Sequence, residues 1–281
     1  IREGTMKVVF LLTACISILA VALICIFLFA NGIPTMHKIG LGKFLFGMTW
    51  APNQELYGIF PMIVGSLYVT AGAMIVGVPG GLLTALYLSR FARGRTGSFL
   101  RSGVELLAGI PSVVYGFFGL VIIVPFVRLL GPGTGLSVLA ASLILGIMIL
   151  PTVITVAQSA LDAVPARYYE GALALGVDHE HAVFKVVAPA AASGIMAAIV
   201  LGLGRAIGET MAVVMVAGNM PIIPDSLLSG VRTMTANIVL EMGYAADLHR
   251  EALIATGVVL FVFILLITML LNVIRKRGEA R

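Results

Sequence analysis

The chain has 281 residues, of which 60% are hydrophobic and 11% charged, and its mean hydropathy is +1.09. A soluble domain usually has about a quarter charged residues and roughly half apolar residues. This composition excludes a soluble enzyme, a disordered protein and a nucleic-acid-binding module. The 18 basic and 13 acidic residues give a net charge of +5, which is modest for this length.

Six stretches of the chain are long and apolar enough to cross a membrane. A spanning helix needs about 20 mostly apolar residues, because the hydrocarbon core of a bilayer is about 30 Å thick. Helix is the economical conformation there, since lipid offers the backbone amides no hydrogen-bond partner. The expected spans are 8–30, 62–89, 106–130, 136–160, 194–218 and 252–274. We therefore expect an all-α, polytopic membrane protein with six transmembrane helices.

The first span and the basic residues predict the orientation of the chain. Residues 8–30 exceed the apolar core of a secretory signal, which is about 7–15 residues long, so we expect this span to be retained. Basic residues favour the cytoplasmic side of a membrane. With the N-terminal tail in the cytoplasm, that side has twelve Lys and Arg residues and the opposite side has five. Both termini are therefore predicted to be cytoplasmic.

Prolines and glycines interrupt several of the predicted spans. They lie at residues 77–81, 109–111 and 150–151. Proline removes one backbone hydrogen bond and clashes with a preceding carbonyl, so one interpretation is a kink that neighbouring helices relieve. The other interpretation is that Pro111, with Ser112 and Tyr115 just beyond it, exposes polar groups to a transport pathway, because broken helices line cavities in transporters.

Residues 161–193 form the one long loop on the predicted cytoplasmic side. A short helix with Tyr168 and Tyr169 outside the membrane needs a partner that covers it. Gly176 permits a sharp turn at the end of this helix, and Pro189 is suited to the start of the next helix. The alternative is an ordinary amphipathic helix that lies at the membrane surface.

The spacing within this loop is specific. Glu170-Gly171-Ala172 is followed after three residues by Gly176, then after nine more by Val186, and Pro189 closes the run. This pattern resembles the EAA loop of ABC-importer permeases, and its departures from that consensus do not change the spacing. The resemblance implies a helix that docks on a separate ATPase. The coupling residues would be Tyr169, Glu170, Ala172, Gly176 and Pro189.

The chain has no phosphate-cradling motif for ATP. Such a motif needs a Gly-Lys pair and a second glycine five residues before the first; the only Gly-Lys pair is Gly42-Lys43, and position 37 is His. We interpret Asp178-His179-Glu180-His181 as a solvated turn rather than a metal site, because no cysteine or further histidine is near. We therefore expect a transport subunit and not an enzyme, with no metal or cofactor of its own, and with ATP and Mg²⁺ on the partner ATPase.

Arg205 and Glu209 are the only charged residues deep within any predicted span. An arginine at the centre of a spanning helix costs about 2.5–3.5 kcal/mol on insertion scales. A spacing of four residues predicts that both side chains share one helical face, about 6 Å apart along the axis. One interpretation is an ion pair that only fastens two helices together.

The other interpretation is a site on a water-accessible path for an anion. A guanidinium offers a fork of donors that matches tetrahedral oxyanions. Glu209, as an acceptor, would favour an oxyanion that keeps a proton near neutral pH, as phosphate does and sulfate does not. Thr210 follows directly and is included in the predicted site, together with Ser112 and Tyr115.

Three parts of the sequence extend the resemblance. They are Gly204–Val213 with Gly218-Asn219, Gly109–Gly116, and Arg232–Ile238. These segments look like the permease subunits of phosphate ABC importers, and the continuation Met211-Ala212-Val213 favours the PstC type over the related PstA type. The likeness covers the chain from about residue 40 onward.

The resemblance implies a type I ABC-importer permease in the bacterial inner (plasma) membrane, with Arg205 and Glu209 on the translocation path. It also implies a heterodimer with a PstA-like permease, two PstB-like ATPase subunits and a PstS-like phosphate-binding protein. Residues 1–281 would form a single transmembrane permease domain that includes the coupling loop 161–193. The alternatives are a permease for molybdate, tungstate or sulfate, an ion-driven carrier or channel, and a purely structural subunit.

Overall fold

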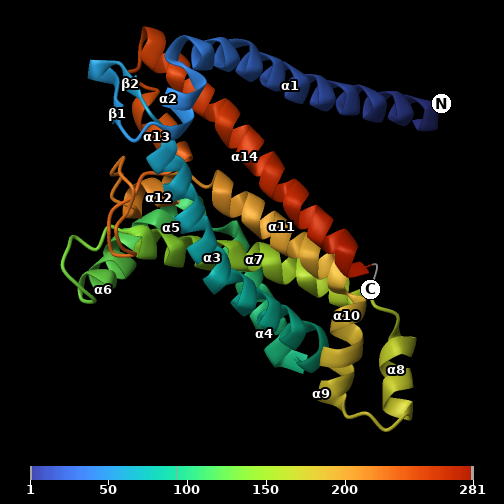
Figure 1. Ribbon diagram of the computed structural model, residues 1–281. Helices are drawn as coiled ribbons and strands as arrows, with labels where there is room; N and C mark the ends of the chain where they lie inside the picture. Colours follow the sequence, from blue (N-terminus) through green and yellow to red (C-terminus); the bar gives the residue numbers. More distant parts are fainter. Residues whose placement is uncertain (1, 93, 280–281) are drawn as a thin grey trace. The chain divides into compact units, whose positions relative to one another are not determined.

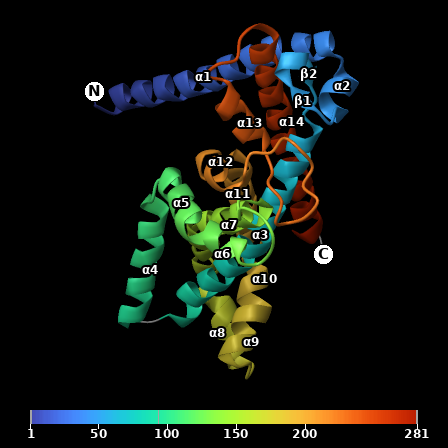
Figure 2. The ribbon, with the colours of Figure 1, turned by 90° about the vertical axis from the view of Figure 1, so that its left-hand side faces the viewer.

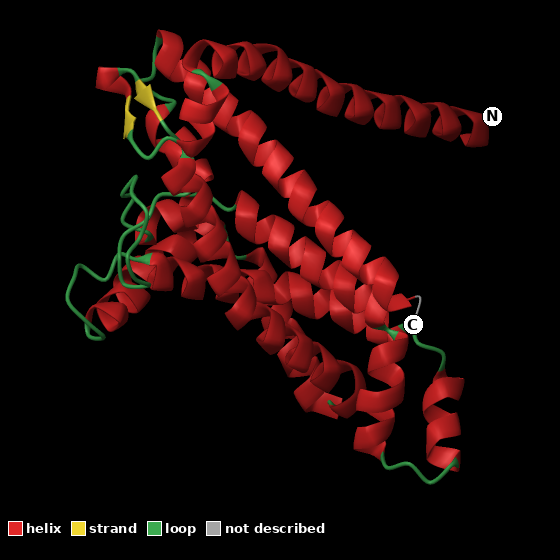
Figure 3. Ribbon diagram, viewed as in Figure 1, coloured by secondary structure: helices red, strands yellow, loops and turns green. Residues whose placement is uncertain are grey.

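The structure, a computed structural model, describes residues 2–92 and 94–279, with side chains from Met6 to Val273. Helices account for most of the described chain (Figures 1 and 3), which confirms the expected all-α class. Within these ranges the one sheet is a two-stranded antiparallel ribbon. Two of the twelve basic residues that were assigned to the cytoplasmic side, Arg93 and Arg281, lie outside the described residues.

The chain divides into two compact units, which we describe separately. The first comprises the residues up to Phe60 together with Ile238–Val262. The second comprises Pro61–Asn237 and the residues from Phe263 onward. Arg205, Glu209 and the predicted coupling loop all belong to the second unit.

A small polar centre organises the first unit. Its elements are α1 (Arg2–Ile39), α2 (Leu41–Phe46), β1 (Trp50–Ala51), the short 3₁₀ turn η1 (Pro52–Gln54), β2 (Leu56–Tyr57), the end of α13 (Met234–Glu241) and the first part of α14 (Asp247–Glu279). Trp50 lies opposite Tyr57 in the strand pair. The buried carboxylate of Glu241 accepts a hydrogen bond from Trp50 Nε1 at 2.8 Å, and His249 Nε2 lies 2.8 Å from the same oxygen. These bonds give the connection after α1 a defined fold.

The second unit is a layer of packed helices. They are α3 (Phe60–Leu86), η2 (Tyr87–Phe91), α4 (Gly94–Gly109), α5 (Ser112–Phe118), η3 (Gly119–Ile123), α6 (Val124–Arg128), α7 (Val138–Asp162), α8 (Ala166–Ala174), α9 (His179–Ala182), η4 (Val183–Val187), α10 (Ala188–Ala190), α11 (Ala192–Gly208) and α12 (Met211–Val216), with the start of α13 and the end of α14. The segments η2, η3 and η4 have π-helical hydrogen bonds. In Figures 1 and 2, α3, α7 and α11 run side by side, and α8 and α9 form a hairpin at one end.

The helices α3 and α7 remain continuous despite their prolines. Pro79 lies inside α3 and Pro151 inside α7, so both positions agree with the interpretation of a kink and not of a break. The two helices approach closely at small residues, because a side chain at Gly77 would collide with Ile149 and with the carbonyl oxygen of Gly146. As a result α7 is the most buried of the long apolar helices.

Two of the six expected spans are not single helices. Four described helices are long and apolar enough to cross a membrane: Met6–Ile39, Phe60–Phe91, Val138–Asp162 and Asp247–Val273. Two more spans arise only if each of two bent pairs is one span. One pair is Gly94–Gly109 with Ser112–Arg128, bent by 99°, and the other is His179–Ala190 with Ala192–Gly208, bent by 71°.

The spans expected over 106–130 and 194–218 are therefore each interrupted, the first at a proline where the sequence allowed either a kink or a break. The first is interrupted at Ile110–Pro111, because a residue that precedes proline disfavours helical backbone angles and proline itself has no N–H to donate. The second ends at Gly208, and Glu209 then adopts an extended conformation with φ −71° and ψ 133°.

Replacing Gly77 tests the close approach of α3 and α7. A Cβ at Gly77 would lie 2.7 Å from the Gly146 carbonyl oxygen, whereas one at Gly103, in α4, would meet no atom within 4 Å. Alanine in a helix is favoured over glycine by about 1 kcal/mol, so Gly103→Ala should keep or raise the melting temperature of the protein in detergent. Gly77→Ala should lower it. An equal rise for both variants would contradict the packing described here.

Candidate functional site

Arg205 lies near the end of α11, beside α7. Its guanidinium donates a hydrogen bond to Thr152 Oγ1 at 2.8 Å, and Thr152 follows Pro151 in α7. The side chain of Arg205 is half-buried and lies within electrostatic range of the Tyr115 hydroxyl. A guanidinium has five N–H donors, and in the described part of the chain one side chain, Thr152, engages it. Donors therefore remain for an incoming acceptor.

The structure corrects the predicted relation between Arg205 and Glu209. They do not share one helical face, because α11 ends at Gly208 and α12 begins at Met211. Glu209 Oε1 instead accepts a hydrogen bond from the backbone N–H of Ala212 at 3.2 Å. A carboxylate is stabilised at a helix N-terminus, where the amides have no partner within the helix. The two charged side chains thus have different partners, and among the described residues no ion pair fastens them together.

The first turn of α13 and the residues just before it contact the break between α11 and α12. Thr235 Oγ1 donates to the carbonyl oxygen of Glu209 at 3.2 Å and lies 3.1 Å from Thr233 Oγ1. Arg232 donates from Nε to the Asn219 carbonyl oxygen at 2.8 Å and from a terminal nitrogen to Asn237 Oδ1 at 3.0 Å. These polar side chains hold the loop after α12 against the interrupted helix.

The other predicted site residues lie at the bend between α4 and α5. Ser112 is half-buried in the first turn of α5, and Tyr115 is buried one turn later. The Tyr115 hydroxyl donates to the carbonyl oxygen of Leu107 at 2.8 Å, across the bend. Thr210 is half-buried beside Glu209 and donates to the Gly208 carbonyl oxygen at 3.3 Å.

The two breaks meet in space. A Cβ at Gly116 in α5 would lie 3.0 Å from the Cα of Ala212 in α12, so these short helices are in close contact. The structure therefore brings Ser112 and Tyr115 to the same region as Arg205, Glu209 and Thr210. It adds two residues that sequence reasoning missed.

The missed residues are Thr152 and Thr235. Thr152 is 53 positions from Arg205 in the chain, and its only sequence signal is its place after Pro151. Thr235 belongs to the segment Arg232–Ile238 whose likeness to phosphate permeases was noted above, but nothing in the pattern indicates its contact with Glu209.

The predicted coupling loop forms a helix, a turn and a return helix. In α8, Tyr169 is half-buried, Glu170 is exposed and Ala172 is buried. Gly176 has φ +83°, a conformation that favours glycine, and its N–H donates to the Leu173 carbonyl oxygen at 2.9 Å. Pro189 is exposed in α10, near the start of that short helix.

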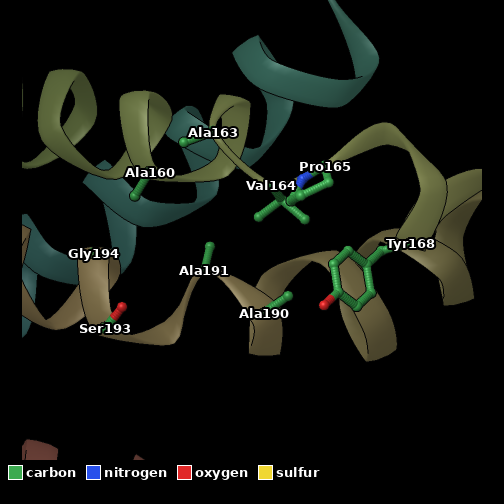
Figure 4. A pocket seen from close by; sticks show the side chains of 9 residues that line it. All are labelled: Ala160, Ala163, Val164, Pro165, Tyr168, Ala190, Ala191, Ser193 and Gly194. Carbon is green, nitrogen blue, oxygen red and sulfur yellow. The ribbon is translucent and has the colours of Figure 1, made fainter.

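A cavity lies at the base of the loop. It has a volume of about 630 Å³, and Figure 4 shows mostly small side chains from the end of α7, from α8 and from the α10–α11 bend around it. The lining residues are Ala160, Ala163, Val164, Pro165, Tyr168, Ala190, Ala191, Ser193 and Gly194. Their side chains carry no charge, so the cavity does not suit an anion.

The Asp178–His181 segment differs from the solvated turn that we expected. His181 is exposed and its Nδ1 lies 2.7 Å from Asp178 Oδ1. His179, in contrast, is half-buried, and its Nδ1 lies 2.7 Å from the Tyr169 hydroxyl. Among the described residues, no group of three or more His, Cys, Asp or Glu side chains could hold a metal ion.

Comparison with known proteins gives consistent matches. Residues 77–279 match the family described as binding-protein-dependent transport system inner membrane component. The probable ABC transporter permease protein YqgH of Bacillus subtilis is 37% identical, over 96% of this chain and 90% of its own length. The phosphate transport system permease protein PstC of Mesorhizobium japonicum is 33% identical, over 92% of this chain and 85% of its own.

Solved structures show the same fold. A chain of the MetNI methionine ABC transporter in an inward-facing conformation aligns with a TM-score of 0.62. The alignment covers 82% of this chain and 99% of that chain at 20% sequence identity. Together with the family match, this likeness shows the type I ABC-importer permease fold that the resemblance implied.

Truncating Glu209 tests its role at the start of α12. Loss of a side chain that caps a helix N-terminus typically costs about 1 kcal/mol. We expect Glu209→Ala to lower the melting temperature in detergent, and Glu209→Gln, which keeps an acceptor oxygen, to lower it less. Glu105→Ala, at an exposed position in α4, serves as the control. Equal melting temperatures for Glu209→Ala and the control would contradict the cap.

Proposed function

The chain belongs to the family of binding-protein-dependent transport system inner membrane components, and on this basis we propose that it is the permease subunit of an ATP-driven importer of inorganic phosphate. Permeases of this family are transport subunits and not enzymes, and ATP is hydrolysed by a separate subunit. The relatives that are named for phosphate transport match this chain over most of its length.

The observation that carries the substrate proposal is the half-buried guanidinium of Arg205. A cation inside a spanning segment is costly, and Thr152 engages only part of its donor set. An oxyanion that passes beside it would supply the missing acceptors with charge-assisted hydrogen bonds. In this proposal Arg205 is the last strong contact before release.

Glu209 supports phosphate over a fully deprotonated oxyanion. The Ala212 N–H holds one of its oxygens at 3.2 Å, and the second oxygen is an acceptor for a substrate proton. Phosphate keeps a proton near neutral pH and would donate it there, whereas sulfate has none to donate and would be repelled by the carboxylate. Thr210, Ser112 and Tyr115 complete the proposed translocation site.

A second permease fits the open side of α11. A Cβ at Gly204 or at Gly208 would meet no described atom outside its own helix within 4 Å, so this side of the helix, next to Arg205, has room for close contact with another helix. We propose a PstA-like permease as that partner, two PstB-like subunits that bind ATP and Mg²⁺, and a PstS-like phosphate-binding protein outside.

The loop with α8 would connect the permease to its ATPase. In the proposed cycle, ATP binding moves α8 and turns the spans outward, so that the permease accepts phosphate from the binding protein. Hydrolysis then resets the spans. Tyr169, Glu170, Ala172, Gly176 and Pro189 are the proposed coupling residues, and the cavity beside α8 leaves room for the helix to move.

Neutralising Arg205 tests the transport site. We expect Arg205→Gln to lower phosphate uptake by cells at least about tenfold, the size expected for losing a hydrogen bond to a charged group. The complex should still assemble, as judged by co-purification of the ATPase. Arg128→Gln, at an exposed arginine that ends α6, should retain uptake. Wild-type uptake by Arg205→Gln would refute the role of this residue.

The same complex in proteoliposomes distinguishes the alternative substrates and drivers. Uptake of labelled phosphate should require ATP and should resist a tenfold excess of sulfate or molybdate. Competition by sulfate or molybdate would assign the permease to another oxyanion. Uptake without nucleotide would identify an ion-driven carrier or channel instead.

Cysteine labelling tests the proposed orientation, with both termini and the α8 loop in the cytoplasm. In a chain with Cys15 and Cys25 replaced by serine, Glu180→Cys should react with a membrane-impermeant maleimide only after the cells are opened. Asp225→Cys, in the loop after α12, should react in intact cells. The reverse pattern would overturn the orientation.

A further inference from the structure

Tyr169 joins the coupling helix α8 to the body of the second unit. Its ring packs against a hydrophobic cluster that α3, α7 and η4 form at this end, with Ala85, Leu161 and Val187 among its members. Its hydroxyl lies 2.7 Å from Nδ1 of His179, and the two rings meet edge to face with centroids 5.7 Å apart. Tyr169 is thereby held by packing on one side and by a polar contact on the other.

His179 extends this contact to the end of the α3 segment. Its ring lies against Phe91, with centroids 4.7 Å apart and an angle of 66° between the ring planes. Phe91 is the last residue of the π-helical turn η2 and is stacked on Tyr87, one turn earlier. A continuous row of rings therefore runs from α8 through His179 to η2.

The end of α3 is in turn tied to α7. The guanidinium of Arg90, next to Phe91, donates to the Leu161 carbonyl oxygen at 2.5 Å, and Ser89 donates to the Asp162 carboxylate at 2.5 Å. These bonds join η2 to the last turn of α7. The same helix carries Thr152, the hydrogen-bond partner of Arg205.

On the opposite side of α8, Tyr168 faces a cavity, and the one ring contact described for it is with the neighbouring Arg167, 5.7 Å from the ring centroid. Tyr168, the neighbour of Tyr169, lines the 630 Å³ cavity (Figure 4), and its side chain is 47% exposed. A force on α8 would therefore reach the spans through Tyr169 and His179, the side where the helix has firm contacts.

We infer that His179 is a positioning residue, which transmits the movement of the coupling helix through Phe91 to the ends of α3 and α7. This inference rests on the proposed function, because the movement arises from ATP binding on the partner subunit. His179 is not part of the proposed transport site. Its role is to hold the rings of Tyr169 and Phe91 at a fixed separation, so that α8 and the spans move together.

His181 provides a matched control in the same turn. It is two residues away, its side chain is 69% exposed, and it contacts Asp178 within its own turn. Replacing it removes an imidazole ring from the same segment, as replacing His179 does, but leaves the row of rings intact.

The test measures the number of anions imported per ATP hydrolysed, in proteoliposomes that contain the complete complex. We expect His179→Ala to lower this ratio about fivefold, the effect of one lost hydrogen bond, with unchanged co-purification of the ATPase. His181→Ala should keep the wild-type ratio. His179→Asn, whose Oδ1 can replace Nδ1 as a partner of Tyr169, should recover part of the ratio.

Tyr169→Phe removes only the hydroxyl, so it tests the same bond without altering His179. It should lower the ratio to a similar extent, and the double variant Tyr169→Phe/His179→Ala should be no worse than His179→Ala alone. A wild-type ratio in both single variants, an equal loss in His181→Ala, or loss of ATPase binding in His179→Ala would overturn the inference. If the wild-type complex imports sulfate instead of phosphate, the proposed substrate is wrong, but the ratio measured with sulfate still tests His179.

Discussion

The structure depends on accommodating the guanidinium of Arg205 inside a segment of apolar helices. An isolated charge there is unfavourable, and the chain meets the cost by gathering polar groups around it. Thr152 accepts one hydrogen bond, and α11 stops three residues later, so that backbone groups of the break lie nearby. Glu209 and Thr235 then satisfy some of these backbone groups, since polar groups without partners are costly in lipid.

The sequence predicts the long helices well, because their apolar runs leave no other conformation in a membrane. It does not predict which proline breaks a helix. Pro79 and Pro151 lie in continuous helices, whereas Pro111 lies at a bend of 99°. At Pro111 the Tyr115 hydroxyl donates to the Leu107 carbonyl oxygen across the bend, a contact that hydropathy and periodicity do not reveal. Likewise, helical periodicity places Arg205 and Glu209 on one face of a single helix. It does not indicate that the helix ends at Gly208 and that Glu209 caps the next one.

The sequence also does not predict the contacts between residues that are far apart in the chain. Charge and spacing identify Arg205, but its partner Thr152 comes from another helix. The sequence alone does not distinguish the two histidines of the Asp178–His181 segment. Folding distinguishes them, because α8 places Tyr169 beside His179 and leaves His181 in solvent. The EAA-like spacing predicted the turn at Gly176, since that turn is a local property of the backbone.

The hydrogen bond across the bend between α4 and α5 joins two residues that are close in sequence. Donor and acceptor, Tyr115 and Leu107, are eight residues apart in the same polypeptide. Closing a loop of this length costs less entropy than bringing distant helices together. This contact can therefore form early in folding, before the long-range contacts of the helix bundle.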